Sequence, residues 1–269
     1  MSISKNILDI VVCPKCKQSL EKNGNSLVCF NKHCYDMSKE GYINFLLANA
    51  KKSKDPGDDQ LMINARDMFL SKGYFDKLRD EITRLVNNYD GNVVLDAGCG
   101  TGYYSKNLKN KDIICADISK HAVKRTAKNN EQAFCIVSSI FDLPIKDKSV
   151  DIVLNIFAPK PNLEFKRVLK DDGVILEVVP AKEHLKELKS LMYNDFNRPN
   201  VEKYAFGDFS LIKSERIGYS VKLKDREDVI NLLKMTPYWY KGGEKYALLD
   251  TIPQDINVTF DFIINVWKV

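Results

Sequence analysis

A short apolar run that ends in an acid and three alternating glycines constrains the fold of this chain most strongly. The run at residues 93–95 is apolar and partly β-branched, which is typical of a buried strand in a parallel sheet. Asp96 follows it, and then come Gly98, Gly100 and Gly102. Glycine has no Cβ, so the chain can turn sharply there and a ligand can approach the backbone. We expect a helix over residues 103–108, whose free N–H groups would face that ligand.

The acid at the end of this strand indicates the charge of the ligand. Asp96 would repel a phosphate group, whereas it would attract a ligand with an ammonium or a sulfonium group. Asp117 ends the next apolar run, where a carboxylate accepts hydrogen bonds from ribose hydroxyls in doubly wound folds. Together these features resemble the first two motifs of class I S-adenosylmethionine-dependent methyltransferases. The alternatives are a dinucleotide-binding fold and a glycine turn that binds nothing.

Alternating strands and helices predict a parallel, doubly wound sheet. We expect strands at residues 92–97, 112–117, 133–137, 150–155 and 174–179, and helices at 61–72, 75–89, 119–129 and 183–193. Residues 216–223 and 260–266 alternate between apolar and polar, which suits an antiparallel hairpin that closes the sheet. The predicted fold class is α/β, a Rossmann-like methyltransferase sheet with a small N-terminal zinc-binding module.

The zinc module is predicted from cysteine spacing. Four of the seven cysteines precede residue 35, a pattern that favours metal binding over disulfides in a reducing compartment. Cys13 and Cys16 form one pair, and Cys29 with either His33 or Cys34 forms the second. Two such pairs across a hairpin complete a tetrahedron, and thiolates with an imidazole select zinc. We interpret the site as structural; buried free thiols are the alternative.

Charge and composition indicate how the chain divides into domains. The polar segment at residues 51–60 separates a predicted zinc-binding, RNA-recognition module at 1–50 from a methyltransferase domain at 61–269. Residues 1–56 contain nine Lys or Arg and five Asp or Glu, so they carry most of the net charge of +5. This bias permits a phosphate-backbone partner, although a solvated lysine surface gives the same bias. Without a long apolar run or a signal-peptide pattern, a soluble, cytoplasmic protein without a membrane partner is expected.

Four aromatic residues lie in or near the predicted module: Phe30, Tyr35, Tyr42 and Phe45. They could stack on unpaired bases, with Lys32 and Lys39 on phosphates. The alternative is packing around the metal and against the second domain, which we expect for at least half of the four.

The whole chain resembles the bacterial 23S rRNA guanine-N1 methyltransferases. The matching pieces are Cys13-x2-Cys16-x12-Cys29-x3-His33, Tyr35-Asp36-Met37, Lys39-Glu40-Gly41-Tyr42, Asp55-Pro56-Gly57-Asp58, Leu95-Asp96-x-Gly98-Cys99-Gly100-x-Gly102-Tyr103-Tyr104 and Met235-Thr236-Pro237. The resemblance implies methylation of a guanine in the hairpin 35 loop of 23S rRNA, with S-adenosylmethionine as methyl donor. It also implies a homodimer whose zinc modules help to bind RNA. One branch of the family is tied to tylosin-type macrolide resistance.

The resemblance also assigns residues. It implies that zinc is bound by Cys13, Cys16, Cys29 and His33. It implies that the methyl donor lies at Gly100 and Thr101, with His184 nearby. The resemblance to class I methyltransferases adds Asp96, Gly98, Gly102 and Asp117 around the donor and Ser139 near its adenine. A tyrosine beside the cofactor in the family aligns with Phe75, so any contact there lacks the hydroxyl.

The catalytic residues are less defined by the sequence. Guanine N1 carries a proton at neutral pH, so a group must accept that proton as the methyl group transfers. Asn155 stands where amino-methylating enzymes carry an Asn/Asp-Pro-Pro-aromatic motif, so by analogy it would orient the substrate and contact the cofactor. Asp36 or Glu40 could accept the proton. The competing functions are a small-molecule methyltransferase and a non-catalytic RNA-binding factor.

Overall fold

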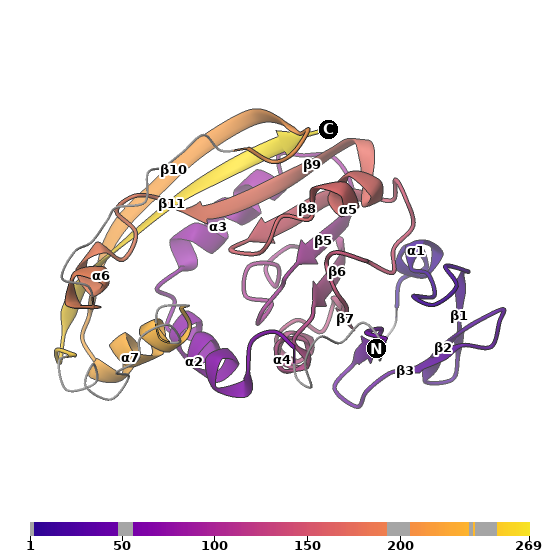
Figure 1. Ribbon diagram of the computed structural model, residues 1–269, viewed down its shortest axis with the longest axis horizontal. Helices are drawn as coiled ribbons and strands as arrows, with labels where there is room; N and C mark the ends of the chain where they lie inside the picture. The colour runs from indigo at the N-terminus through magenta and orange to yellow at the C-terminus, as the bar shows by residue number, and fades with distance from the viewer. Residues whose placement is uncertain (1–2, 48–55, 193–204, 237–238, 240–251) are drawn as a thin grey trace.

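The computed structural model describes residues 3–47, 56–192, 205–236, 239 and 252–269 (Figure 1). A long, twisted sheet forms the centre of the molecule, and the N-terminal module lies beside one end of it, next to β6 and β7. Within these residues no helix is long and apolar enough to cross a membrane.

The central sheet contains, among the described residues, eight strands in the order β10-β11-β9-β8-β5-β6-β7-β4. Their bounds are β4 Tyr42–Asn44, β5 Val93–Ala97, β6 Asp112–Asp117, β7 Phe134–Val137, β8 Val150–Ile156, β9 Leu169–Pro180, β10 Ser210–Leu223 and β11 Ile256–Lys268. Neighbours from β4 to β9 run parallel, whereas β11 is antiparallel to both β9 and β10. The predicted parallel sheet with a C-terminal antiparallel hairpin is confirmed.

The helices begin at polar caps where the sequence supplies them. Their bounds are α1 Lys5–Ile10, α2 Gln60–Ser71, α3 Asp76–Val86, α4 Lys120–Asn129, α5 Asn162–Val168, α6 Lys186–Met192 and α7 Arg226–Lys234. Asp59 accepts a hydrogen bond from Met62 N at 2.8 Å and starts α2. Ser119 accepts from Ala122 N at 3.2 Å and starts α4. Each cap satisfies an N–H group that has no partner inside the helix.

Three predicted elements differ from the structure. Residues 103–108 form turns and no helix; they lie between Gly102 and Asn110, which both have positive φ, of 71° and 57°. The helix expected from residue 183 begins at Lys186, since Leu185 also has a positive φ of 56°. The turn expected at residues 171–173 belongs to β9, which is twice the expected length.

The N-terminal module is continuous with the central sheet. It has its own antiparallel sheet of β1 Leu20–Asn23, β2 Ser26–Cys29 and β3 Cys34–Asp36. The next strand, β4, leaves the module and pairs with β7 in parallel. The domain boundary at residue 50 stays a prediction, and residues 51–55 of the predicted linker lie outside the described residues.

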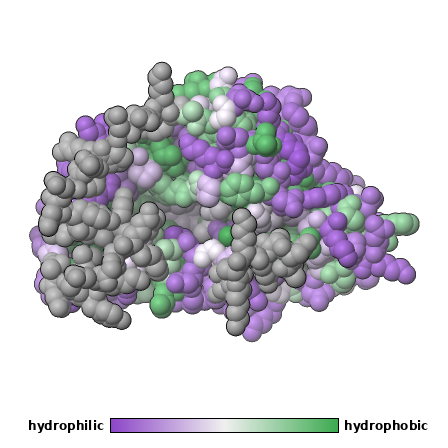
Figure 2. Space-filling model, in the orientation of Figure 1, coloured by the Kyte–Doolittle hydropathy of each residue, from purple (hydrophilic) through white to green (hydrophobic). Residues whose placement is uncertain are grey.

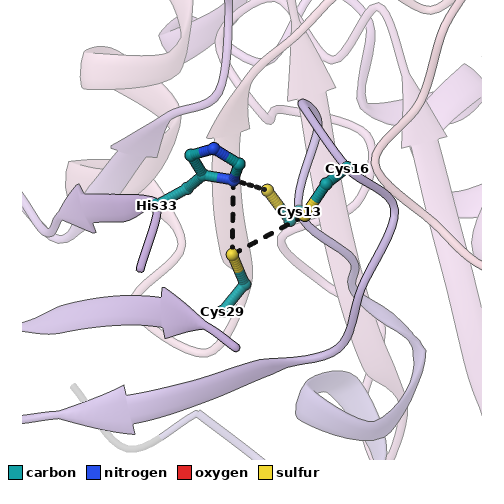
Figure 3. Close-up of side chains that lie close together, drawn as sticks. All are labelled: Cys13, Cys16, Cys29 and His33. Carbon is teal, nitrogen blue, oxygen red and sulfur yellow. Dashed lines mark hydrogen bonds between the residues drawn. The ribbon is translucent and has the colours of Figure 1, made fainter. Parts of the chain in front are cut away.

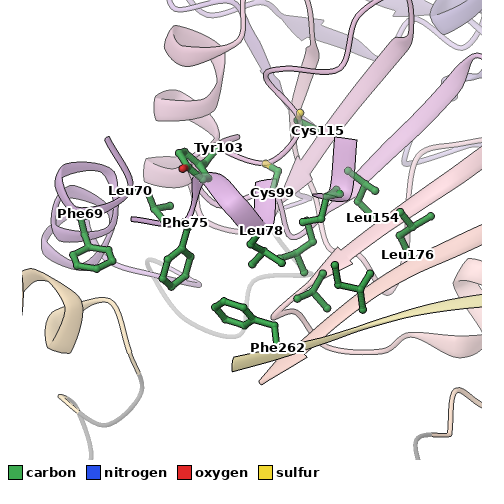
Figure 4. Close-up of a cluster of buried hydrophobic side chains, with 14 of the residues drawn as sticks. Phe69, Leu70, Phe75, Leu78, Cys99, Tyr103, Cys115, Leu154, Leu176 and Phe262 are labelled. Atoms are coloured by element: carbon green, nitrogen blue, oxygen red, sulfur yellow. The ribbon is translucent and has the colours of Figure 1, made fainter. Parts of the chain in front are cut away.

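Both faces of the sheet are covered by apolar side chains. Along β5, Val94 packs into one cluster while Val93 and Leu95 pack into the other, as the alternation of a strand requires. The first cluster is shown in Figure 4, where Phe69 and Phe75 lie near Phe262 of β11. The second cluster combines residues of the module with residues of the methyltransferase sheet, so the two parts share one core.

Substitution of Phe45 tests whether the two parts share one core. Its side chain is 2% exposed and its ring lies 5.0 Å from the Tyr35 ring. Phe45→Ala would leave a cavity at the junction, so we expect the free energy of unfolding to fall by about 3–5 kcal/mol. Urea denaturation measures this change. Phe30 is 91% exposed, so Phe30→Ala is the matched control and should change stability by less than about 0.5 kcal/mol. Equal losses for the two variants would contradict a shared core at Phe45.

Candidate functional site

A cavity of about 870 Å³ lies where the parallel strands end. Its lining includes residues at the carboxyl ends of β5, β6, β8 and β9, and residues of α2 and α7 cover it from the other side. Figure 2 shows that the face seen in Figure 1 is hollowed near its centre, where apolar residues are visible. Doubly wound folds bind ligands at this edge of the sheet.

The glycine turn after β5 forms one wall of the cavity. Gly98, Gly100 and Thr101 line it, but Gly102 does not. A Cβ on Gly102 would come within 2.6 Å of Thr126 Cγ2, so this glycine allows the turn to pack against α4. Thr126 in turn donates its hydroxyl hydrogen to Gly100 O at 2.8 Å. The predicted glycines therefore divide into two that border the ligand space and one that supports the turn.

Asp96 borders the cavity with an unsatisfied charge. Its side chain is 3% exposed, and Oδ2 has no hydrogen-bond partner among the described residues. Burial raises the pKa of Asp96 to about 7, and the nearby charge of Asp117 acts in the same direction. A buried carboxylate without a cation is costly, so this wall suits a positively charged ligand.

Asp117 ends the neighbouring strand and is oriented by backbone groups. Gly100 N donates to Oδ2 at 3.0 Å, and Ser119 N donates to Oδ1 at 2.8 Å. Burial raises the pKa of Asp117, and these two bonds partly offset that effect. A carboxylate that accepts two hydrogen bonds keeps lone pairs for further donors, such as the hydroxyls of a ribose. Ser139, expected beside the adenine, also lines the cavity.

Phe75 and His184 line the part of the cavity that lies near Phe260 and Phe262 of β11. Phe75 is 2% exposed, and its ring lies 4.8 Å from Phe260 and 5.3 Å from Phe262. His184 accepts a hydrogen bond at Nδ1 from Asp261 N at 3.3 Å. Burial lowers the pKa of His184 to about 3, and the charge of Lys189 acts in the same direction. His184 is therefore neutral at physiological pH, so it contributes shape and hydrogen bonding without charge.

The two predicted catalytic residues are not among the described residues that line the cavity. Asn155 is 1% exposed, and its Nδ2 donates to Pro159 O at 2.7 Å. Asp36 lies on β3 of the module and accepts a hydrogen bond from Ser26 Oγ at 2.6 Å. Glu40 forms an ion pair with Lys124 at 2.9 Å. The catalytic roles of these residues stay predictions.

Sequence reasoning missed Arg66, whose guanidinium borders the cavity. Arg66 pairs with Asp58 and donates from Nη2 to Met235 O at 3.3 Å. The signal was present in α2, because Met62, Arg66 and Leu70 are spaced four residues apart and all three line the cavity. A charged residue on an otherwise apolar helix face indicates a polar partner in the interior. Tyr104 and Phe157, which also line the cavity, were missed as well.

Four side chains of the module converge on one point (Figure 3). Cys13, Cys16, Cys29 and His33 place their ligand atoms within 4.8 Å of one another. The Sγ atoms of Cys16 and Cys29 are 3.7 Å apart, and His33 Nδ1 lies 3.4 Å from the Sγ atoms of Cys13 and Cys29. A tetrahedral zinc ion with Zn–S bonds of about 2.3 Å separates its sulfur ligands by roughly this distance. The residues therefore fit zinc.

The structure selects His33 over Cys34. Cys34 is exposed, and its Sγ lies 3.8 Å from Asp36 Oδ1, outside the cluster. Two tight turns hold the ligands: Lys17 N donates to Cys13 O and Lys32 N donates to Cys29 O, both at 2.8 Å. Lys17 and Lys32 both have positive φ, of 59° and 60°, so each turn ends in a left-handed residue.

Known proteins resemble both parts of the chain. Residues 11–54 match the zinc-ribbon family described as "RlmA, N-terminal", and residues 88–226 match a methyltransferase domain family. The Bacillus subtilis protein named "Putative 23S rRNA (guanine-N(1)-)-methyltransferase YxjB" is 31% identical, over 94% of this chain and 95% of its own length. The Streptomyces fradiae 23S rRNA (guanine(748)-N(1))-methyltransferase is 28% identical, over 90% of each chain. A solved S-adenosylmethionine-dependent methyltransferase from Aquifex aeolicus is 14% identical, with a TM-score of 0.47, over 79% of this chain and all of that one.

The charge of Asp96 gives a pH test of cofactor binding. Below a pKa of about 7 the free carboxyl is protonated, and it must lose that proton to pair with a cation. The affinity for S-adenosylmethionine should therefore rise as pH rises, by roughly fivefold to tenfold between pH 6 and pH 7.5. Calorimetry in two buffers of different ionisation enthalpy measures the affinity and the released proton. Asp96→Asn should bind weakly at every pH; a wild-type affinity that ignores pH would contradict this role of Asp96.

Metal content distinguishes the two candidate fourth ligands. We expect one zinc ion per chain of the purified protein by inductively coupled plasma mass spectrometry. His33→Ala should lose most of it, because three thiolates leave the tetrahedron open. Cys34→Ala is the matched control and should keep its zinc, since Cys34 lies outside the cluster. Zinc loss in Cys34→Ala together with zinc retention in His33→Ala would contradict His33 as the fourth ligand.

Proposed function

Because this chain belongs to the 23S rRNA (guanine-N1)-methyltransferase family, we propose that it methylates N1 of a guanine in the hairpin 35 loop of 23S rRNA. The methyl donor is S-adenosylmethionine, which supplies a methyl group on a positively charged sulfur. The guanine that corresponds to guanine 748, which is named for the Streptomyces fradiae relative, is one candidate target.

One observation carries the proposal: a zinc cluster and a methyl-donor cavity occur on one chain and share one core. The cavity alone would suit a methyltransferase of any substrate. A small-molecule methyltransferase has no need of a basic zinc module beside that cavity. The combination therefore favours a large anionic substrate that contacts both parts.

The residues around the cavity would contact different parts of the methyl donor. Asp96 would pair with a cationic group of the methyl donor, and Asp117 would accept hydrogen bonds from its ribose. The glycine turn leaves room for the donor close to the backbone. The target guanine has to leave its base stack to reach this depth. Asp36 stays the candidate proton acceptor of the proposal, whereas the side chain of Asn155 is bound to Pro159 O and is not among the described residues that line the cavity.

Of the four aromatic residues of the N-terminal module, Phe30 is the one whose exposure supports contact with RNA. Tyr42 and Phe45 are buried, and Tyr35 lies within hydrogen-bond distance of Cys13 Sγ at 3.2 Å. Phe30 is 91% exposed between two zinc ligands, and three exposed lysines belong to the same turns: Lys15, Lys17 and Lys32. A free aromatic ring among cations suits an unpaired base with its phosphates.

The proposal also contains three further properties, of which the first and the third are implied by the family resemblance. They are a homodimer, a cytoplasmic location and a contribution to tylosin-type macrolide resistance. Sedimentation measures the first. Deletion of the gene, followed by measurement of tylosin sensitivity, measures the third.

Methylation of an RNA fragment tests the proposed reaction. Purified protein, labelled S-adenosylmethionine and a 23S rRNA fragment that contains hairpin 35 should give a product that stops reverse transcriptase at one guanine. The stop is expected because N1 lies on the pairing edge of the base. Phe30→Ala should raise the KM for RNA severalfold and leave the affinity for S-adenosylmethionine unchanged. Protein that binds the donor and leaves the fragment unlabelled would refute the proposed function.

A further inference from the structure

The loop after β8 holds an aromatic residue in an unusual backbone conformation. Phe157 has φ of 54°, a region that bulky residues rarely adopt, and its side chain is 44% exposed. It lines the cavity together with Ala158 and Pro159. Strain of this kind persists only where the surroundings enforce it, and it occurs often at functional sites.

Two backbone-directed bonds enforce the shape of this loop. Asn155 Nδ2 donates to Pro159 O at 2.7 Å, which ties the start of the loop to its end. Phe157 N donates to Val178 O at 3.1 Å, which ties the middle of the loop to β9. Asn155 therefore acts on the loop from inside the protein, although the sequence suggested a role at the substrate.

An ion pair between a half-buried lysine and a buried glutamate holds the far end of the loop. Lys160 pairs with Glu177, which is fully buried on β9 and lies opposite Asn155 in the strand register. Glu177 Oε2 also accepts hydrogen bonds from Asn265 Nδ2 at 3.1 Å and Trp267 Nε1 at 2.9 Å. Burying a carboxylate costs free energy even when it is paired, so a hydrophobic residue would suit stability as well or better. The charge at Glu177 is better explained by its effect on Lys160 and the loop.

The loop presents a ring that is packed on one side and accessible on another. The Phe157 ring lies 5.6 Å from the Phe262 ring and 6.3 Å from the Tyr104 ring. The loop also lies against the glycine turn, since a Cβ on Gly98 would come within 2.8 Å of Ala158 Cβ. The accessible part of the ring therefore borders the cavity close to the place where the donor is proposed to bind.

We propose that Phe157 is the stacking platform for the target guanine, and that Asn155, Lys160 and Glu177 are positioning residues that hold its ring in place. The proposal rests on the proposed function, because it names how that site binds its base. Stacking on an aromatic ring suits a purine, which has a large flat π-face. The strained backbone is then the cost of presenting the ring beside the methyl donor.

A second exposed ring that lines the cavity, that of Phe141, provides a comparison for Phe157. Phe141 is 61% exposed and follows Ser139, to whose Oγ its backbone N donates at 3.2 Å. This places Phe141 on the side where the adenine of the donor is expected. Phe141→Ala should therefore weaken the binding of S-adenosylmethionine, whereas Phe157→Ala should weaken the use of RNA.

The test measures donor affinity and RNA kinetics separately. Wild-type protein is first shown to methylate the hairpin 35 fragment. Phe157→Ala should lower kcat/KM for RNA by about tenfold or more and change the Kd for S-adenosylmethionine by less than about twofold. Phe157→Gly, which relieves the positive φ, should behave like Phe157→Ala if the ring itself is needed. Phe157→Tyr should restore most of the activity.

The positioning role needs a readout that a general loss of stability would not give. Glu177→Gln removes the charge opposite Lys160 and should lower kcat/KM for RNA; combined with Phe157→Ala it should add little further loss. Asp171→Asn is the matched control, because it removes the exposed ion pair with Lys148 and should change nothing. Additive losses would overturn the positioning role.

Failure of the inference can be told apart from failure of the proposed function. An active wild-type enzyme whose Phe157→Ala variant keeps its kcat/KM for RNA would overturn the inference alone. Loss of donor affinity in that variant would also overturn it, since the ring would then serve the cofactor. Wild-type protein that binds the donor and never labels RNA would overturn both.

Discussion

The buried pair of acids at the ends of β5 and β6 is the constraint on which the rest of the site depends. Asp96 and Asp117 lie at the ends of adjacent, parallel strands; Asp96 is 3% exposed, Asp117 is half-buried, and burial raises the pKa of both carboxyl groups. Backbone N–H groups compensate Asp117, but Asp96 keeps an oxygen without a partner. Asp96 lines the same cavity as Gly98 and Gly100, and Arg66, which also lines it, is paired with Asp58. A cationic donor therefore completes the electrostatics of a site that the fold alone leaves unbalanced.

Much of this site could be predicted from the sequence because its residues are close together along the chain. Asp96, the glycines and Thr101 belong to one turn, and the zinc ligands form two pairs separated by a hairpin. Spacing within a turn fixes geometry almost without reference to the remaining fold. The parallel order of the strands followed from the alternation of apolar runs and helical patterns, which is also a local signal.

Residues that act through long-range packing could not be predicted in the same way. Glu177 meets Lys160 only because β9 lies beside β8, and Asn155 turns toward Pro159 only because the loop folds back. The absence of a helix at residues 103–108 is also not visible in the composition of this segment. A phenylalanine near an apolar strand usually belongs to the core, so sequence alone provides no signal that Phe157 is exposed. Its exposure depends on a backbone conformation that only the structure shows.

The pairing of β4 with β7 has a practical consequence for work on this protein. Without β4, the N–H and C=O groups along one side of β7 would have no partner, and an exposed strand of this kind recruits other chains into aggregates. A shortened protein that begins near residue 60 would lose β4 and the module's part of the shared core at the same time. Poor solubility of such a fragment would then reflect the bare strand, and it would say nothing about whether zinc is needed for methyl transfer.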